Sequence, residues 1–185
     1  MTVETLVLGP VSANTYIVTD VVSGETAVID CGECTAELLE KLSNKNVKYI
    51  LLTHGHADHI LGVYGLRQAF PEAKIVIHRE DAICLTDERY SLGVSIAPGR
   101  QKNTEADITV DEGDKITLGS LVFTVMHTPG HTKGSICYYV ESERALFTGD
   151  TLFCLTVGRT DLYGGNDDEM YASIKRLYEM PGDYA

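Results

Sequence analysis

The chain of 185 residues is long enough for one globular domain, and its 44% hydrophobic and 23% charged residues exclude a disordered protein. Its formal net charge of −12 argues against a nucleic-acid partner, because phosphate binding depends on clustered Lys and Arg. A signal peptide and an apolar run of roughly 18 residues are both absent, and five cysteines fit reduced thiols, so we expect a cytoplasmic protein without membrane contact.

The first half of the chain alternates between strand and helix patterns. Runs rich in Val, Ile, Thr and Leu predict strands over residues 3–8, 15–19 and 26–29. Thr35 is a candidate N-cap for a helix that ends near Asn44, and the near-continuous apolar run at 47–52 predicts a strand buried on both faces. One helix is expected from Ile60 to about Phe70.

The second half is richer in strands. A strand at 74–77 and a short helix at 79–85 precede an irregular segment, 86–107, which we expect to be a loop over a site. Further strands are predicted at 108–110, 115–118, 121–126, 136–140 and 145–147. A final helix is predicted over 167–179. Two sheet-forming halves with helices between and after them favour a layered α/β sandwich.

The segment T-H-G-H-A-D-H at 53–59 contains three of the six histidines. Side chains two residues apart in an extended segment point the same way, so His54 and His56 can converge on one ion. Asp58 and His59 follow where the chain turns into a helix, and there they can face a second ion. Imidazole and carboxylate groups suit zinc and iron.

Two later motifs match this chemistry. The T-P-G-H-T motif at 128–132 presents His131 in a turn after a strand, and T-G-D at 148–150 presents Asp150 at another strand end. Together with H-x-H-x-D-H, N-T-Y-I-V at 14–18 and V-I-D-C-G at 28–32, these motifs resemble the metallo-β-lactamase superfamily. The resemblance implies one domain over residues 1–185 with a four-layer αββα sandwich fold and metals at one rim of its sheets.

The resemblance also implies the ligand set. It assigns His54, His56 and His131 to a first metal, Asp58 and His59 to a second, and Asp150 to a bridging position. The family places one more histidine in a P-G-H segment after the last helix, where this chain has Pro181-Gly182-Asp183. We therefore expect the chain to lack its extreme C-terminus and the second metal site to be partly occupied.

Within the family, the residues after Asp150 look like those of the small glyoxalase II-like hydrolases. The resemblance implies two divalent ions, zinc first with iron or manganese as alternatives, and hydrolysis of a small-molecule thioester or ester. Asp58 is expected to orient the attacking hydroxide and accept its proton. The rival functions are a mononuclear-iron persulfide dioxygenase and a lactone hydrolase. Antibiotic hydrolysis is less expected, because several true β-lactamases have a cysteine where this chain has Asp150.

Several other residues are expected to stay outside the metal site. Cys31 and Cys34 form a C-x-x-C motif, but the surrounding chain does not follow a thioredoxin pattern. Asp30 is expected to hold a loop beneath the site rather than to bind metal. Two histidines that end strands, His78 and His127, are expected to be hydrogen-bonding residues, and Arg159 with Asp161 a buried ion pair at the rim.

Overall fold

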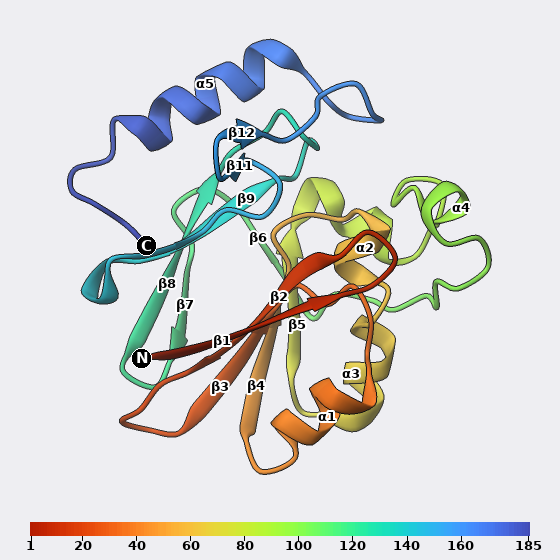
Figure 1. Ribbon diagram of the computed structural model, residues 1–185, viewed down its shortest axis with the longest axis vertical. Coiled ribbons are helices and arrows are strands. Elements are labelled where there is room, and N and C mark those ends of the chain that lie inside the picture. Colours follow the sequence, from red (N-terminus) through yellow and green to blue (C-terminus); the bar gives the residue numbers. More distant parts are fainter.

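The computed structural model describes residues 1–185 and contains two stacked β-sheets (Figure 1). The first has six strands in chain order, antiparallel from β1 to β3 and parallel from β3 to β6. Its strands are β1 (Thr2–Leu8), β2 (Ala13–Thr19), β3 (Glu25–Ile29), β4 (Asn46–Leu51), β5 (Lys74–His78) and β6 (Ile108–Val110).

The second sheet has four antiparallel strands in the order β10-β9-β8-β7. Its strands are β7 (Lys115–Leu118), β8 (Leu121–His127), β9 (Ile136–Val140) and β10 (Ala145–Phe147). A hairpin of two short strands, β11 (Leu152–Phe153) and β12 (Thr156–Val157), follows it. The sequence patterns predicted the strands of both large sheets but not this hairpin, because two-residue strands have no periodicity to detect.

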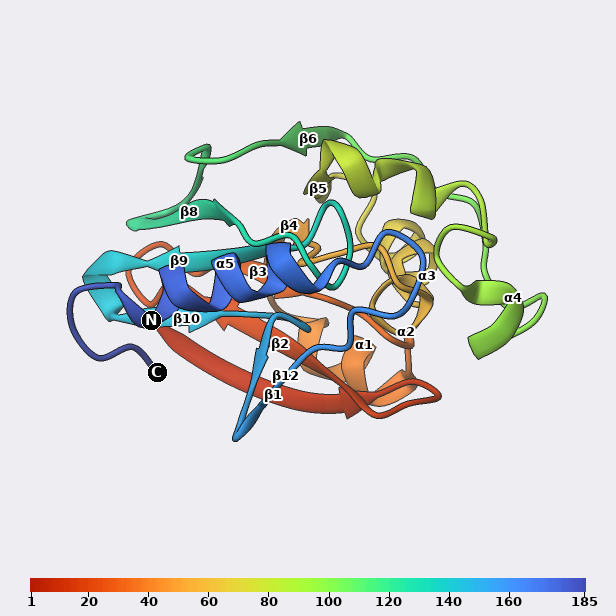
Figure 2. The same cartoon turned by 90° about the horizontal axis from the view of Figure 1, so that it is seen from above.

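Helices cover the outer face of each sheet (Figures 1 and 2). Three helices pack on the six-stranded sheet: α1 (Ala36–Leu42), α2 (Ala57–Ile60) and α3 (Val63–Ala69). Their buried contacts with the sheet come from Leu38, Leu42, Ile60 and Leu66. Leu177 of α5 (Asp167–Tyr178) packs on Met126 and Cys137 of the four-stranded sheet. The remaining helical segments are η1 (Arg79–Leu85), α4 (Gly93–Ile96) and η2 (Glu141–Glu143).

Apolar residues on consecutive positions of β4 and β5 face two different cores. Ile50 and Ile75 belong to the core beneath the helices, whereas Leu51 and Val76 belong to the core between the two sheets. This alternation confirms the expectation that the run ending at Leu52 is buried on both faces. The layers of the molecule are, in order, helices, the six-stranded sheet, the four-stranded sheet and a helix. This order confirms the αββα sandwich. No helix has the length and apolar character needed to cross a bilayer.

The single helix expected from Ile60 to Phe70 is wrong, because the chain forms α2 and α3 with a break at Leu61 and Gly62. A Cβ at Gly62 would lie 2.2 Å from Cys31 Sγ, and the Gly62 N–H donates to the Cys31 carbonyl at 2.9 Å. This contact with the loop after β3 fixes the break. The expected helix at 79–85 is a 3₁₀ helix, and the segment 86–107, expected to be a loop, contains the short helix α4.

Candidate metal centre

Three buried histidines from two loops meet at the rim of the sheets. His54 and His56 follow β4, and His131 lies in the loop after β8. Their ligand nitrogens all lie within 4.8 Å of one another. The rings are no more than 3% exposed, so they are held by packing rather than by solvent contact. The structure therefore brings together the three residues predicted for the first ion.

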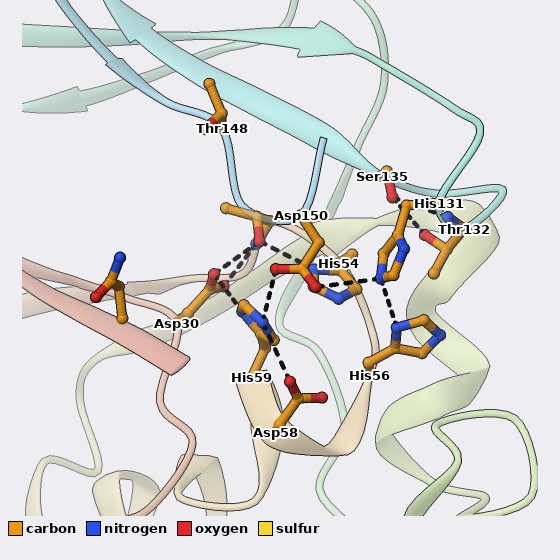
Figure 3. A network of polar contacts seen from close by, with 12 residues as sticks. Asp30, His54, His56, Asp58, His59, His131, Thr132, Ser135, Thr148 and Asp150 are labelled. Atoms are coloured by element: carbon orange, nitrogen blue, oxygen red, sulfur yellow. Dashed lines mark hydrogen bonds and ion pairs between the residues drawn. The ribbon is translucent and has the colours of Figure 1, made fainter. Parts of the chain in front are cut away.

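A second group lies directly beside the first. It consists of His54, His59 of α2 and Asp150 from the loop after β10, again with ligand atoms within 4.8 Å. Asp150 Oδ1 lies 3.2 Å from His59 Nε2, and Asp150 Oδ2 lies 3.4 Å from His131 Nε2 (Figure 3). The two oxygens of Asp150 thus face the two groups, as a bridging ligand requires.

Asp58 lies at the edge of the second group. Its Oδ2 is 3.5 Å from His59 Nε2, and the residue is 8% exposed. Burial raises the pKa of the Asp58 carboxyl, while His59 opposes that shift. The N-cap of α2 is His56, so Asp58 does not occupy the capping position of this helix. Its carboxylate is free to face the site.

Asp30 fixes the orientation of two of the histidines. His59 Nδ1 donates to Asp30 Oδ2 at 2.8 Å, and the Thr53 hydroxyl donates to the same oxygen at 2.7 Å. Because the hydroxyl hydrogen is used, Thr53 Oγ1 accepts from His54 Nδ1 at 3.2 Å. His54 then directs a bare Nε2 into the site, and His59 directs its Nε2 there towards Asp150. Asp30 also accepts from the Thr53 N–H at 2.8 Å, as expected for a residue that holds this loop.

His131 is oriented in the same way by a backbone carbonyl. Its Nδ1 donates to the Arg159 carbonyl at 2.7 Å, which directs Nε2 towards the other histidines. That Nε2 lies 2.8 Å from His56 Nδ1. Two nitrogens from different loops are therefore directed at one point.

The residues present fit a metal ion. His54 Nε2 is buried in the site and has no hydrogen-bond partner, which is costly for a polar atom that binds nothing. Burial lowers the pKa of His56 to about 3 and that of His54 well below its ordinary value, so both rings are neutral. Neutral imidazole is the form that binds metal. A cluster of neutral histidines beside Asp150 matches the donor set of zinc or iron.

The second group is electrostatically different from the first. Burial disfavours the charged form of His59, but Asp30 and Asp150 outweigh it and raise the pKa of His59 well above its ordinary value. His59 in turn helps to lower the pKa of the Asp150 carboxyl against the effect of burial. The side of the site that contains the carboxylates therefore favours positive charge.

Asp81 is a structural residue of the site that the sequence did not reveal. This buried carboxylate of η1 accepts from the Gly55 N–H at 2.8 Å and from the Gly134 N–H at 2.8 Å. It also accepts from the Thr132 hydroxyl at 2.7 Å. Asp81 thus ties the loop of His54 and His56 to the loop of His131. The only sequence signal is an acidic residue soon after a buried strand, which is too common to be informative.

The other histidines lie outside the centre. His78 and His127 stack on each other with ring centroids 4.3 Å apart and planes 8° apart. His127 Nε2 donates to the Lys133 carbonyl at 2.8 Å, in agreement with a hydrogen-bonding role. Neither residue belongs to a candidate ligand group.

Two expectations about other residues have different outcomes. Cys31 and Cys34 are free thiols that pack against Gly62 and Gly65, and neither belongs to a candidate ligand group. Arg159 and Asp161 do form an ion pair, with a nitrogen-to-oxygen distance of 2.6 Å. The expectation that this pair is buried is wrong, because the two side chains are 62% and 68% exposed.

The family model that describes the metallo-beta-lactamase superfamily matches residues 8–184 of the chain. The chain belongs to this superfamily. An uncharacterized protein of Aquifex aeolicus is 39% identical over 184 residues, covering 99% of this chain and 86% of the relative. A hydroxyacylglutathione hydrolase of Rhodopseudomonas palustris is 34% identical over 171 residues, covering 91% of this chain but 58% of the relative.

Solved structures of this superfamily superimpose over most of the chain. The B3 metallo-beta-lactamase BLEG-1 is 32% identical with a TM-score of 0.87, covering 94% of this chain and 84% of that one. TTHA1623 in a di-iron-bound form is 30% identical with a TM-score of 0.83, covering 96% of this chain and 87% of that one. ETHE1 from Myxococcus xanthus is 29% identical with a TM-score of 0.78, covering 99% and 72%.

Proposed function

We propose that this member of the superfamily is a metal-dependent hydrolase of thioesters. The observation that carries the proposal is the junction at Asp150, where two groups of buried ligand atoms meet beside the Asp58 carboxylate. The similarity to a hydroxyacylglutathione hydrolase supports the thioester as the substrate class. The match covers only 58% of that relative. The proposal therefore does not extend to the thiol part of the relative's substrate.

The proposed roles are those that the family resemblance implies, and the short distances between these side chains support them. His54, His56 and His131 would hold one ion, Asp58 and His59 a second, and Asp150 both. When bound, such ions polarise a carbonyl and make water a nucleophile near neutral pH. Asp58 Oδ2 would accept the proton of the attacking water. A thiolate is a good leaving group, so the reaction needs no strong general acid in the site.

We propose zinc as the native metal, with iron or manganese as the alternatives. Imidazole and carboxylate ligands suit all of these to different degrees, and TTHA1623 was solved in a di-iron-bound form. We also propose that the protein acts in the cytoplasm on a small molecule. The five cysteines are all free thiols, which fits a reducing compartment.

The experiment is a substrate panel with zinc-loaded and iron-loaded protein. It contains an acyl thioester, a lactone, a β-lactam and glutathione persulfide, with thiol release, ring opening and oxygen uptake as readouts. The β-lactam is included because BLEG-1 is a metallo-beta-lactamase. The proposal predicts that thiol release from the thioester is the fastest reaction and that a chelator abolishes it.

The rival functions give different results in the same panel. Oxygen consumption with persulfide, one tightly held iron and no thiol release would identify a dioxygenase instead. Faster opening of the lactone or the β-lactam than of the thioester would replace the proposed substrate class. An Asp58→Asn variant is the matched control for turnover at this site. It removes the proposed proton acceptor, changes the side-chain volume little and should release thiol more slowly than wild type.

A further inference from the structure

A cavity of about 440 Å³ opens beside the second ligand group. Its inner part is lined by residues of the candidate metal centre, namely Asp30, Asp58, His59 and Asp150. All of them except Asp150 are buried. Cavities of roughly 300–1,000 Å³ are typical of small-molecule sites. A substrate group in this cavity lies next to the residues proposed to act on the scissile carbonyl.

The outer wall of the cavity is apolar. Its apolar lining comes from Val11, Ala13, Leu152, Phe153 and Cys154. Val11 in the turn between β1 and β2 is 57% exposed, and Phe153 of β11 is 41% exposed. A bound apolar group would remove this surface from water, which is favourable in proportion to the area covered.

Apart from the proposed ions, the cavity offers a negatively charged substituent no cationic side chain other than His59. Its charged lining consists of the carboxylates and His59 of the inner part, and no Lys or Arg side chain lines it. The neutral polar lining comes from Ser12, Asn14, Tyr16 and Thr148. Asn14 donates to the Tyr16 hydroxyl at 3.2 Å, and the Thr148 hydroxyl donates to the Leu152 carbonyl at 2.8 Å. A second carboxylate on the acyl group would therefore lie between apolar side chains and acidic ones, which is unfavourable.

We infer that this cavity binds the acyl group of the substrate and selects an uncharged, apolar one. The inference rests on the proposed thioesterase function and goes beyond it, because it specifies the group attached to the scissile carbonyl. Phe153 is the residue that determines this specificity, since it has the largest apolar side chain among the residues of the wall. Leu155 lies on the same hairpin but is fully exposed and does not line the cavity.

The first test varies the acyl group while N-acetylcysteamine is kept as the thiol. We expect kcat/KM to rise from acetyl to hexanoyl by up to about threefold to fourfold per methylene, which corresponds to about 0.8 kcal/mol per buried CH₂. Succinyl should be a poorer substrate than butyryl. Phe153→Ser should reduce the hexanoyl-to-acetyl ratio, whereas Leu155→Ser, the matched control, should leave that ratio unchanged.

The second test measures binding without hydrolysis. Saturation-transfer NMR compares a neutral ketone, 2-octanone, with 7-oxooctanoate, which has the same chain length and a terminal carboxylate. The neutral ketone should bind more tightly, and Phe153→Ser should weaken it while Leu155→Ser does not. Equal binding of both ketones, or binding that Phe153→Ser leaves unchanged, would overturn the inference.

The two tests separate this inference from the proposed function. If no thioester is hydrolysed but the ketone preference and its loss in Phe153→Ser are observed, the thioesterase proposal fails and the apolar cavity stands. If thioesters are hydrolysed but succinyl is preferred, or selectivity follows the thiol instead of the acyl group, the thioesterase proposal stands and the assignment of the cavity fails.

Discussion

At the scale of single residues, Asp30 determines how two histidines face the site. The V-I-D-C-G motif suggested that Asp30 holds a loop, but its bond to His59 could not be predicted, because it joins residues 29 positions apart. The six proposed ligand positions, in contrast, could be predicted from motifs with local spacing. Ligands recur in short patterns, whereas the residues that orient them are brought together only by the tertiary fold.

Replacing Asp30 tests this orienting role. Asp30 has a φ of 55°, a left-handed conformation that Asn also tolerates, so Asp30→Asn should keep the backbone. We expect metal affinity to fall by about 10- to 100-fold, as is typical when the hydrogen-bond partner of a ligand is lost. Titration of metal-free protein measures this, with Asp183→Asn as the control. Unchanged affinity would show that the histidines orient themselves without Asp30.

Asp58 is predicted to affect turnover more than binding to the first group. Asp58→Asn removes the proposed proton acceptor and should lower thioester turnover by about 10²- to 10⁴-fold, the usual contribution of general base catalysis. The ligands of the first group are untouched, so elemental analysis should still find that ion. Turnover close to wild type would remove Asp58 from the mechanism.

At the scale of elements, contacts between distant segments explain where the sequence patterns were insufficient. The apolar stripe at 60–70 fits one helix, and Gly62 alone does not exclude it, since glycine is tolerated in helices at a cost. The break depends on Cys31, which occupies the space that a side chain at Gly62 would need. The strands were predictable because β-branched runs and turn residues are local signals.

Asp81 should stabilise the two histidine loops through its three hydrogen bonds. Asp81→Ala leaves buried N–H groups of Gly55 and Gly134 unpaired, at a cost of about 1–3 kcal/mol for each unsatisfied group. We expect a clearly lower free energy of unfolding in urea titrations and weaker metal binding. Asp87→Ala, which removes a more exposed carboxylate from the following loop, should have a smaller effect. Equal losses in the two variants would contradict the proposed role.

Asp20 links the ends of the two sheets and should make stability depend on pH. It follows β2, accepts from the Ser120 N–H at 2.9 Å in the turn between β7 and β8, and accepts from the Ser23 hydroxyl at 2.7 Å. These bonds hold the pKa of the Asp20 carboxyl well below its ordinary value of 3.8. Its contribution to stability is therefore complete above that value and is lost as the pH falls below it.

The Asp20→Asn variant measures this contribution. The difference in melting temperature between wild type and Asp20→Asn should be largest above about pH 5 and should shrink as the pH approaches 3, because the unfolded wild-type chain then binds a proton at Asp20 that the folded chain does not. Asp183→Asn, at an exposed position, controls for the change in net charge. A difference that stays constant with pH would show that the Asp20 charge is not what links the turns.

At the scale of the whole molecule, the sandwich brings distant parts of the chain to one rim. Figure 3 shows two sets of side chains meeting in one site, His54, His56 and His59 in the first set and His131 and Asp150 in the second. The first set follows β4 of the six-stranded sheet, and the second follows β8 and β10 of the four-stranded sheet. Metal that binds only this folded arrangement should raise the melting temperature, and a chelator should lower it.

The most direct test of the central claim is a zinc titration of metal-free wild type, His56→Ala and His127→Ala, with bound zinc and thioester turnover measured in the same samples. Wild type and His127→Ala should bind zinc and release thiol. His56→Ala lacks a ligand of the first group and should lose that zinc together with hydrolysis. The claim is contradicted if wild type binds no zinc, or if His56→Ala binds and hydrolyses as wild type does.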